Sequence, residues 1–233
     1  MKIILKYISP LNLIVDSIRM CYSSNENSDS KWSLIKDLKK YNSDHFELGP
    51  KDKERIIVCI KSGHTSTLEH SLIHFEIQRF PRSILQEVVR HRIGISYSVQ
   101  STRFTLRKEL KKIITPFHDG VHYKFEEASK FIYLTGVDEI DKHNTETLEL
   151  IRTLVHHGEI KNDVLKQLLP EAYCCDFRVS YNHRSLRHFL ELRSNSDAHY
   201  LIRELTKEMY KQIPDDQKFL YQDIMNKTLF VFD

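Results

Sequence analysis

Residues 82–104 of the chain read RSILQEVVRHRIGISYSVQSTRF, and this stretch combines both kinds of regular secondary structure. Arg82–Arg92 is predicted to form a helix, because its apolar residues return at the spacing of one helical face. Those residues are Ile84, Leu85, Val88 and Val89. Ile95–Phe104 is rich in Ser, Tyr, Val and Thr and is predicted to be extended. Both kinds of element are therefore expected in the fold.

The rest of the chain repeats this mixture without a regular alternation of strand and helix. Strands are predicted at Lys2–Ile8 and at Ile73–Ile77, where apolar and polar residues alternate. Helices are predicted at Leu11–Tyr22, Phe125–Thr135, Thr145–His156, Asn162–Leu169, Asn182–Arg193 and Asp197–Ile213. Because strands and helices are segregated, the sequence predicts an α+β domain with a central, mostly antiparallel sheet flanked by helices.

Length and glycine content limit the kind of fold. The 233 residues suit a single domain spanning 1–233, in which the polar stretch Ser23–Lys53 is expected to be a flexible loop. The chain has only six glycines, and no two of them lie within ten residues of each other. A dinucleotide-binding fingerprint and a P-loop both need clustered glycines, so neither a Rossmann fold nor a P-loop is expected.

Charge and hydropathy argue against two further classes of protein. The formal net charge of +3 is close to neutral and does not indicate a nucleic-acid-binding protein. No apolar run approaches the ~18 residues of a membrane span, and the N-terminus lacks a signal-peptide cleavage site. A cytoplasmic protein without membrane contact is therefore expected.

The reactive side chains do not form a recognisable catalytic group. Cys21, Cys59, Cys174 and Cys175 contain no CxxC pair and are expected to be buried, reduced thiols. If residues 70–74 are extended, the side chains of His70 and His74 are about 13 Å apart, too far to share a metal ion. His118 and His122 flank a glycine that breaks a helix. No metal site is predicted, and no GxSxG motif indicates a serine nucleophile.

Two arginines fall on apolar helix faces in these predictions. At ~100° per residue, Arg92 lies within the apolar stripe of the helix 82–92, and Arg193 lies within that of the helix 182–193. A guanidinium that points inward must meet an anion or a polar partner, because burying it alone costs several kcal/mol. An internal salt bridge, or an arginine that snorkels to water at the helix end, explains one such arginine. Two of them, each among further Arg, His and Asn residues, favour an anionic ligand.

Residues 90–104 resemble the signature of the flavin-dependent thymidylate synthases, in which RHR is followed after a spacer by Ser, and then by Arg and an aromatic residue. Four other segments resemble family segments in the same order. They are residues 20–24 (MCYSS), 63–70 (GHTSTLEH), 169–170 (LP) and 182–193 (NHRSLRHFLELR). The resemblance covers nearly the whole chain.

The resemblance implies an α+β homotetramer whose active sites form between subunits and bind FAD non-covalently without a Rossmann fold. The implied reaction converts dUMP to dTMP, with methylenetetrahydrofolate as the carbon donor and NADPH as the reductant. It implies no metal and no enzyme nucleophile. The protein then contributes orientation and electrostatics.

The resemblance also implies roles for individual residues. The FAD-binding residues are Ser66, Arg90, His91, Arg92, Asn182, Arg184 and His188. The dUMP-binding residues are Glu87, Arg90, Ser101, Thr102 (through its backbone), Arg103, Lys166 and Arg193. Arg193 is also the implied catalytic residue, since it matches the arginine beside the uracil ring. A fixed arginine there stabilises negative charge as it develops on the ring.

The chain departs from the family pattern at four points. The spacer between Arg92 and Ser101 is one residue longer than usual, and Val99 stands where a polar side chain is common. Lys166 replaces an arginine, and His199 replaces a glutamine. Three other functions stay open: nucleic-acid binding by the basic segment 90–103, a different flavin or nucleotide enzyme on the same scaffold, and a non-catalytic paralogue retained for assembly.

Overall fold

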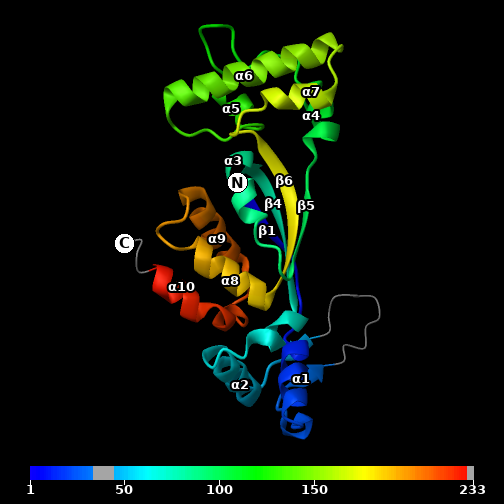
Figure 1. Ribbon diagram of the computed structural model, residues 1–233, viewed down its shortest axis with the longest axis vertical. Coiled ribbons are helices and arrows are strands. Elements are labelled where there is room, and N and C mark those ends of the chain that lie inside the picture. The colour runs from blue at the N-terminus through cyan, green and yellow to red at the C-terminus, as the bar shows by residue number, and fades with distance from the viewer. Residues whose placement is uncertain (34–44, 230–233) are drawn as a thin grey trace. The chain divides into compact units, whose positions relative to one another are not determined.

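A computed structural model describes residues 1–33 and 45–229 (Figure 1). The strands are β1 (Lys2–Ile8), β2 (Lys31–Ser33), β3 (His45–Glu47), β4 (Leu72–Pro81), β5 (Ile95–Val99) and β6 (Cys174–Asn182). The α-helices are α1 (Asn12–Cys21), α2 (Pro50–Lys61), α3 (Arg82–Val88), α4 (Thr102–Leu110), α5 (Phe125–Ala128), α6 (Asp138–His157), α7 (Asn162–Leu165), α8 (His183–Arg193), α9 (Tyr200–Gln212) and α10 (Gln222–Leu229). Short 3-10 turns are η1 (Asn25–Asn27), η2 (Thr65–His70), η3 (Lys166–Leu168) and η4 (Lys218–Leu220).

A four-stranded sheet with the order β1-β4-β6-β5 forms the centre of the fold. Neighbouring strands are antiparallel. The Ser9 N–H donates to the Leu72 carbonyl where β1 ends and β4 begins, and the Asn182 N–H donates to the Gly94 carbonyl where β6 ends and β5 begins. The predicted α+β class with a central antiparallel sheet is confirmed. The interior strand β6 is absent from the sequence predictions.

The chain forms two compact units, each assembled from three segments. Unit 1 comprises Met1–Ile3, Glu76–Arg90 and Tyr97–Arg178, and unit 2 comprises Ile4–Phe75, His91–Ser96 and Val179–Asp233. Each strand of the four-stranded sheet contributes residues to both units. The expectation of one domain over 1–233 stays a prediction.

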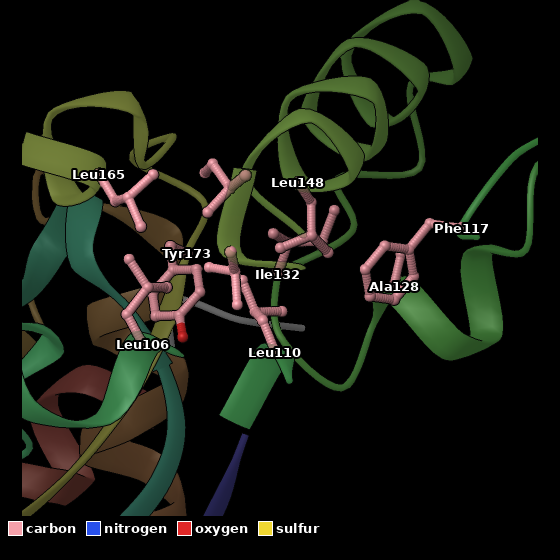
Figure 2. Close-up of a cluster of buried hydrophobic side chains, with 10 residues drawn as sticks. Leu106, Leu110, Phe117, Ala128, Ile132, Leu148, Leu165 and Tyr173 are labelled. Carbon is pink, nitrogen blue, oxygen red and sulfur yellow. The ribbon is translucent and has the colours of Figure 1, made fainter. Parts of the chain in front are cut away.

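The core of unit 1 is a cluster of buried apolar side chains drawn in Figure 2. Helices α4 and α6 supply half of it. The cluster comprises Leu106, Leu110, Phe117, Ala128, Ile132, Leu148, Ile151, Val155, Leu165 and Tyr173. Burying one large apolar side chain contributes about 1.5–3 kcal/mol to the stability of the fold. This cluster therefore holds α4, whose N-terminus carries predicted site residues, against α6 and α7.

The core of unit 2 lies under the C-terminal helices, which lie side by side in Figure 1. The buried apolar side chains of α8 are Leu186, Phe189 and Leu190, and those of α9 are Leu201, Ile202, Leu205 and Met209. Phe189 of α8 also contacts Tyr181 of β6, with ring centroids 5.5 Å apart. The predicted helices 182–193 and 197–213 are present as α8 and α9, each slightly shorter at its N-terminal end.

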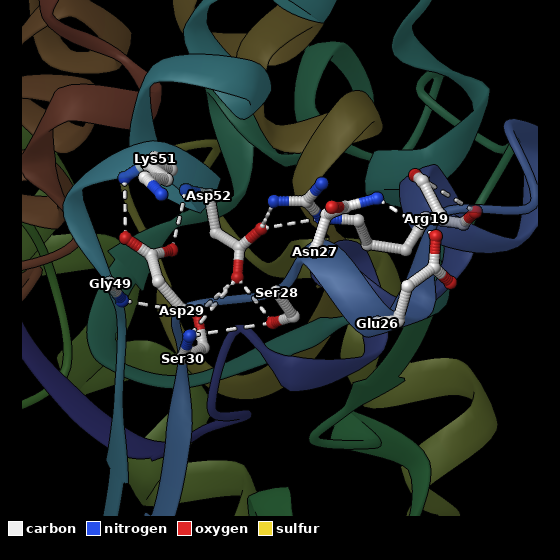
Figure 3. A network of polar contacts seen from close by, with 10 residues as sticks. Arg19, Glu26, Asn27, Ser28, Asp29, Ser30, Gly49, Lys51 and Asp52 are labelled. Atoms are coloured by element: carbon white, nitrogen blue, oxygen red, sulfur yellow. Dashed lines mark hydrogen bonds and ion pairs between the residues drawn. The ribbon is translucent and has the colours of Figure 1, made fainter.

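A polar network joins α1 to the start of α2 within unit 2 (Figure 3). The Arg19 guanidinium donates to one oxygen of the buried Asp52 carboxylate, and the Ser28 and Ser30 hydroxyls, at 2.6 Å each, donate to the other. Burial alone raises the pKa of Asp52, but these hydrogen bonds and the Arg19 charge bring it below its usual value. The network is fully paired and ties η1 to both helices.

The predicted flexible loop Ser23–Lys53 is described only at its ends. Residues 34–44 lie outside the described residues. The described ends contain η1, the antiparallel pair β2 and β3, and the first turn of α2. The Asp29 carboxylate accepts hydrogen bonds from the backbone N–H groups of Lys51 and Asp52 and so caps α2 from a distant segment. The expected flexibility of the whole stretch stays a prediction.

The structure corrects several predictions from the sequence. The predicted helix Phe125–Thr135 is present only as α5, which ends at Ala128, and the helix predicted from Thr145 begins earlier, at Asp138, as α6. The helix that begins at Arg82 ends at Val88, not at Arg92, because the Val88 carbonyl accepts a hydrogen bond from the Tyr97 hydroxyl (2.8 Å) and the chain turns. The predicted extended segment ends at Val99, since α4 begins at Thr102. Of the four unpaired cysteines, Cys21 is exposed, whereas the other three are buried as predicted. Among the described residues, no helix is both long and apolar enough to cross a membrane.

Candidate functional site

The predicted site residues fall into two sets that follow the two units. Unit 2 contains Ser66, His91, Arg92, Asn182, Arg184, His188 and Arg193. Unit 1 contains Glu87, Arg90, Ser101, Thr102, Arg103 and Lys166. The first set holds the predicted FAD contacts except Arg90, and the second holds the predicted dUMP contacts except Arg193.

The unit 2 set is organised around the N-terminus of α8. Asn182 is the N-cap residue, and its side-chain oxygen accepts a hydrogen bond from the Ser185 N–H at 2.8 Å. The Ser185 hydroxyl in turn donates to the Ile93 carbonyl at 2.6 Å. These bonds dock residues 91–94, which follow Arg90, onto the first turn of α8.

Gly94 allows this docking because a side chain does not fit there. Its φ is +67°, which favours glycine. A Cβ built on Gly94 meets the Asn182 side-chain nitrogen at 2.2 Å and the Ser185 hydroxyl at 2.5 Å. The sequence analysis did not identify Gly94. A single glycine between an arginine-rich segment and a strand is the signal that points to a close backbone approach.

Arg193, at the last turn of α8, reaches back to this docked segment. Its Nε donates a hydrogen bond to Nε2 of His91 at 3.0 Å. The His91 ring also packs against Phe189, with ring centroids 5.0 Å apart, and against His188 at 5.9 Å. Desolvation, followed by the charges of Arg193 and His188, lowers the pKa of His91 to about 4. His91 is therefore neutral near pH 7, and its Nε2 accepts the hydrogen bond from Arg193, as the geometry requires.

The prediction that Arg193 faces inward agrees with its half-buried position, but the same prediction for Arg92 is wrong. Arg92 lies beyond the end of α3 in an irregular segment and is exposed. Since the helical projection assumed a helix as far as residue 92, the projected face does not exist. Arg92 is nevertheless the neighbour of His91, and its charge is available at the surface of unit 2.

The remaining unit 2 residues present charge and hydroxyl groups at the surface. Arg184 and His188, four residues apart on α8, share one helical face and are both exposed. Nη1 of Arg184 contacts a Glu69 carboxylate oxygen at 2.6 Å. Glu69 belongs to η2, which also carries the exposed Ser66 and packs against α8. Two segments distant in sequence thus present their predicted ligand-binding side chains together.

A group with phosphate and hydroxyl oxygens, such as FAD, fits these residues. Arg92, Arg184 and His188 supply donors suited to an anionic pyrophosphate. Beside Ser66, the buried Thr67 hydroxyl oxygen has no hydrogen-bond partner within the described part of the chain. Buried polar groups are normally paired, so an unpaired hydroxyl next to a predicted ligand contact is consistent with a missing partner.

The unit 1 set is organised around the N-terminus of α4. Ser101 is the N-cap residue, and its carbonyl accepts the Thr105 N–H at 3.0 Å. Its exposed hydroxyl makes no capping bond to the helix, and the buried Thr102 and exposed Arg103 follow it. The unbonded N–H groups and the dipole of a helix N-terminus attract anions. Ser101, the Thr102 backbone and Arg103 thus lie together at a helix N-terminus, an arrangement that can attract an anion.

Arg103 has a carboxylate neighbour that the sequence analysis missed. Its Nε lies 3.0 Å from a carboxylate oxygen of Asp163, and both side chains are more than half exposed. The Asn162 side chain donates to the Arg103 carbonyl at 2.7 Å and so holds α7 to α4. Lys166 begins η3 and is exposed on the segment that packs against α4.

The other unit 1 residues lie on or near α3 and β5. Glu87 is half-buried on α3, and Arg90 is exposed just after the helix ends. Val99, where the family pattern has a polar side chain, is exposed at the end of β5. No group of three His, Cys, Asp or Glu side chains suited to a metal ion occurs among residues 1–33 and 45–229.

Comparison with known proteins identifies close resemblance over nearly the whole chain. The family model described as thymidylate synthase complementing protein matches residues 3–215. A flavin-dependent thymidylate synthase of Campylobacter jejuni (strain RM1221) is 36% identical over 230 residues, which cover 98% of this chain and 100% of that protein. One from Helicobacter pylori (strain ATCC 700392 / 26695) is 35% identical over 228 residues, which cover 97% and 99%.

Solved structures agree with the sequence comparisons. The crystal structure of the flavin-dependent thymidylate synthase of Helicobacter pylori, complexed with FAD and dUMP, matches with a TM-score of 0.81 and 34% sequence identity. The match covers 96% of this chain and 99% of that chain. A second Helicobacter pylori structure with FAD and dUMP matches with a TM-score of 0.80.

Proposed function

The chain belongs to the flavin-dependent thymidylate synthase family, and from that membership we propose that it catalyses the FAD-dependent reductive methylation of dUMP to dTMP. The enzyme is a methyltransferase that uses methylenetetrahydrofolate as carbon donor and NADPH as reductant. The observation that carries the proposal is the hydrogen bond between Arg193 and His91, which unites the two most distinctive family segments in one cluster.

The FAD-binding surface that we propose is the exposed face formed by η2, the segment 91–94 and α8. Ser66 and Asn182 contribute polar groups, and Arg184 and His188 contribute hydrogen-bond donors. His91, Arg92 and Arg90 complete the proposed set. When bound, FAD supplies the hydride-carrying chemistry that no amino-acid side chain provides.

The dUMP phosphate is bound, in this proposal, at the N-terminus of α4. The Ser101 hydroxyl, the Thr102 backbone and the Arg103 guanidinium donate to its oxygens, and Arg103 exchanges Asp163 for the phosphate. Glu87, Arg90 and Lys166 are further substrate contacts in the proposal. Lysine at 166 supplies charge but cannot make the bidentate contact of an arginine.

Arg193 is the proposed catalytic residue. Methylation of uracil needs electron density on a ring carbon, and this density rises as the ring's amide edge becomes negative. An arginine fixed beside that edge stabilises the negative charge without moving during the reaction. The neutral His91 accepts a hydrogen bond from Nε–H of Arg193 and so fixes the orientation of the guanidinium plane. In this role His91 acts as a positioning residue.

The proposal includes a homotetramer with active sites between subunits, which follows from the family. It also includes a cytoplasmic location, which follows from the sequence. Binding of nucleic acid or a membrane is not part of the proposal. The folate and NADPH co-substrates likewise follow from the family.

Spectroscopy and product analysis test the proposal together. The purified protein is expected to bind one FAD per chain, and to form dTMP only when dUMP, methylenetetrahydrofolate and NADPH are all present. A preparation that takes up no added FAD contradicts the proposal and supports a non-catalytic paralogue or a nucleic-acid binder. FAD binding without dTMP formation supports a different flavin enzyme on the same scaffold.

A further inference from the structure

His183 is a fully buried histidine at the first turn of α8, between the predicted FAD contacts Asn182 and Arg184. Both nitrogens of its ring are hydrogen-bonded. Nδ1 contacts the buried Tyr221 hydroxyl, and Nε2 contacts the buried Ser71 hydroxyl at 3.1 Å. No family motif used in the sequence analysis assigns a role to His183.

The Ser71 contact joins two segments that carry proposed FAD contacts. Ser71 directly follows η2, which holds Ser66, and its carbonyl also accepts the His183 backbone N–H at 3.3 Å. His183 therefore bonds to both the side chain and the backbone of Ser71. The Arg184–Glu69 ion pair spans the same two segments, but both of its side chains are about half exposed. Exposed ion pairs contribute little, so the buried His183–Ser71 pair is the stronger link.

The Tyr221 contact joins His183 to a different segment of the chain. Tyr221 lies between η4 and α10, and the described part of this C-terminal segment carries none of the proposed FAD contacts. Burial lowers the pKa of His183 to about 3, so the ring is neutral and one nitrogen donates while the other accepts. A hydroxyl can donate or accept, so each hydroxyl matches its nitrogen in either tautomer.

We propose that His183 is a positioning residue for FAD, whose Nε2–Ser71 bond sets the spacing between η2 and α8 and hence between Ser66 and the Arg184–His188 face. The Nδ1–Tyr221 bond stabilises the C-terminal segment without setting that spacing. This inference rests on the proposed function, because it assumes that both segments bind the flavin. The inference separates two effects of the His183 ring, on FAD affinity through Ser71 and on stability through Tyr221. The two effects can be measured independently.

The paired variants Ser71→Ala and Tyr221→Phe test this separation, since each removes one hydroxyl from one side of the ring. FAD affinity is measured from the flavin released when the purified flavoprotein is diluted, and stability from the thermal unfolding midpoint. Ser71→Ala is expected to weaken FAD binding about 5-fold or more, the equivalent of one lost hydrogen bond. Tyr221→Phe is expected to lower the unfolding midpoint, with FAD affinity within about twofold of wild type.

Conservative substitutions of His183 itself test which of its two hydrogen bonds maintains FAD affinity. The Gln side-chain amide nitrogen can occupy the Nε2 position, and that of Asn can occupy the Nδ1 position. His183→Gln is therefore expected to retain FAD affinity within about twofold, whereas His183→Asn is expected to lose as much affinity as Ser71→Ala.

The outcomes distinguish failure of the inference from failure of the proposed function. A wild-type protein that binds no FAD refutes the proposed function. A wild-type protein that binds FAD while Ser71→Ala binds it equally well refutes the positioning role. Equal FAD losses in Ser71→Ala and Tyr221→Phe, tracking their losses of stability, also refute it, because they show a structural effect alone.

Discussion

Unit 1 and unit 2 present their site residues in opposite ways. In unit 2 the segment 91–94 is held to α8 by short backbone and side-chain hydrogen bonds, and His91 and Arg193 are half-buried against one another. In unit 1 Arg103, in the first turn of α4, and its partner Asp163 both lie on the surface. One region is preassembled by packing, and the other presents exposed charges in a weak ion pair.

For the proposed function, this difference predicts how each region binds its ligand. A large cofactor that stays bound is suited to a surface whose contacts are fixed in advance, because less ordering is needed on binding. A substrate that enters and leaves in every cycle is suited to exposed cations with modest partners, since a surface ion pair is worth only about 0–1 kcal/mol. Arg193 is the exception, because it belongs to the preassembled region but is proposed to act on the substrate.

The largest expected effect comes from that exception. Arg193→Lys keeps the positive charge but removes the planar guanidinium and its bond to His91. If Arg193 acts mainly in the transition state, single-turnover dTMP formation from pre-reduced enzyme is expected to fall about 100-fold or more. The dUMP affinity, titrated through the flavin spectrum, is expected to fall much less. Equal losses in rate and affinity make Arg193 a simple binding residue.

Arg103→Ala tests the proposed phosphate contact in unit 1. Loss of a charge-assisted contact is worth roughly 1.5–3 kcal/mol, so dUMP affinity is expected to fall about 10–100-fold. FAD content is expected to stay normal. Lys108→Ala, which removes an exposed charge farther along α4, is the matched control. Normal dUMP affinity in Arg103→Ala shows that the phosphate binds elsewhere.

Gly94→Ala tests whether unit 2 depends on its close backbone approach. The added methyl group meets Asn182 and Ser185 well inside van der Waals distance, so the segment 91–94 must move away from α8. FAD affinity is expected to fall about 10-fold, since strain at such a residue costs on the order of 1–3 kcal/mol. Gly120→Ala in unit 1 is the control, because its φ is also positive but its Cβ meets open space. Equal FAD affinity in both variants contradicts the docking argument.

The smallest expected effect is a gain in dUMP affinity. Asp163→Asn removes the carboxylate that competes with phosphate for Arg103. Since an exposed pair is worth about 0.2–1 kcal/mol, dUMP is expected to bind up to about fivefold more tightly. Asp138→Asn breaks another exposed ion pair in unit 1, with Lys142, and is expected to leave dUMP affinity unchanged. Weaker binding in Asp163→Asn is the result that contradicts the exchange of partners.

Hydrophobic periodicity and capping residues predicted the helices and strands whose ends are determined by residues nearby in the sequence. The strand Lys2–Ile8 has the predicted bounds, and the α8 prediction includes its N-cap, Asn182. The α3 prediction ran past Val88 because the reason for the helix end is distant in sequence. The Tyr97 hydroxyl donates a hydrogen bond to the Val88 carbonyl, and the apolar periodicity of the sequence does not predict that bond.

Other features had a local signal that was not used. In β6, buried Phe177 and Val179 alternate with exposed Asp176 and Arg178, which is the period of a half-buried strand. Ser101 precedes α4 and is a residue type typical of a helix N-cap. The family motifs supplied most of the candidate site. Asp163 and Ser71 could not be predicted, because only the folded chain brings them beside Arg103 and His183.

The distribution of cysteines has a practical consequence for labelling chemistry. Burial raises the pKa of Cys59, Cys174 and Cys175, so these thiols are both inaccessible and poor nucleophiles. Cys21, at the end of α1 in unit 2, is exposed. A thiol-reactive fluorophore therefore modifies the native chain at a single position. Changes in unit 2 on addition of FAD can then be followed by that probe without engineering any cysteine.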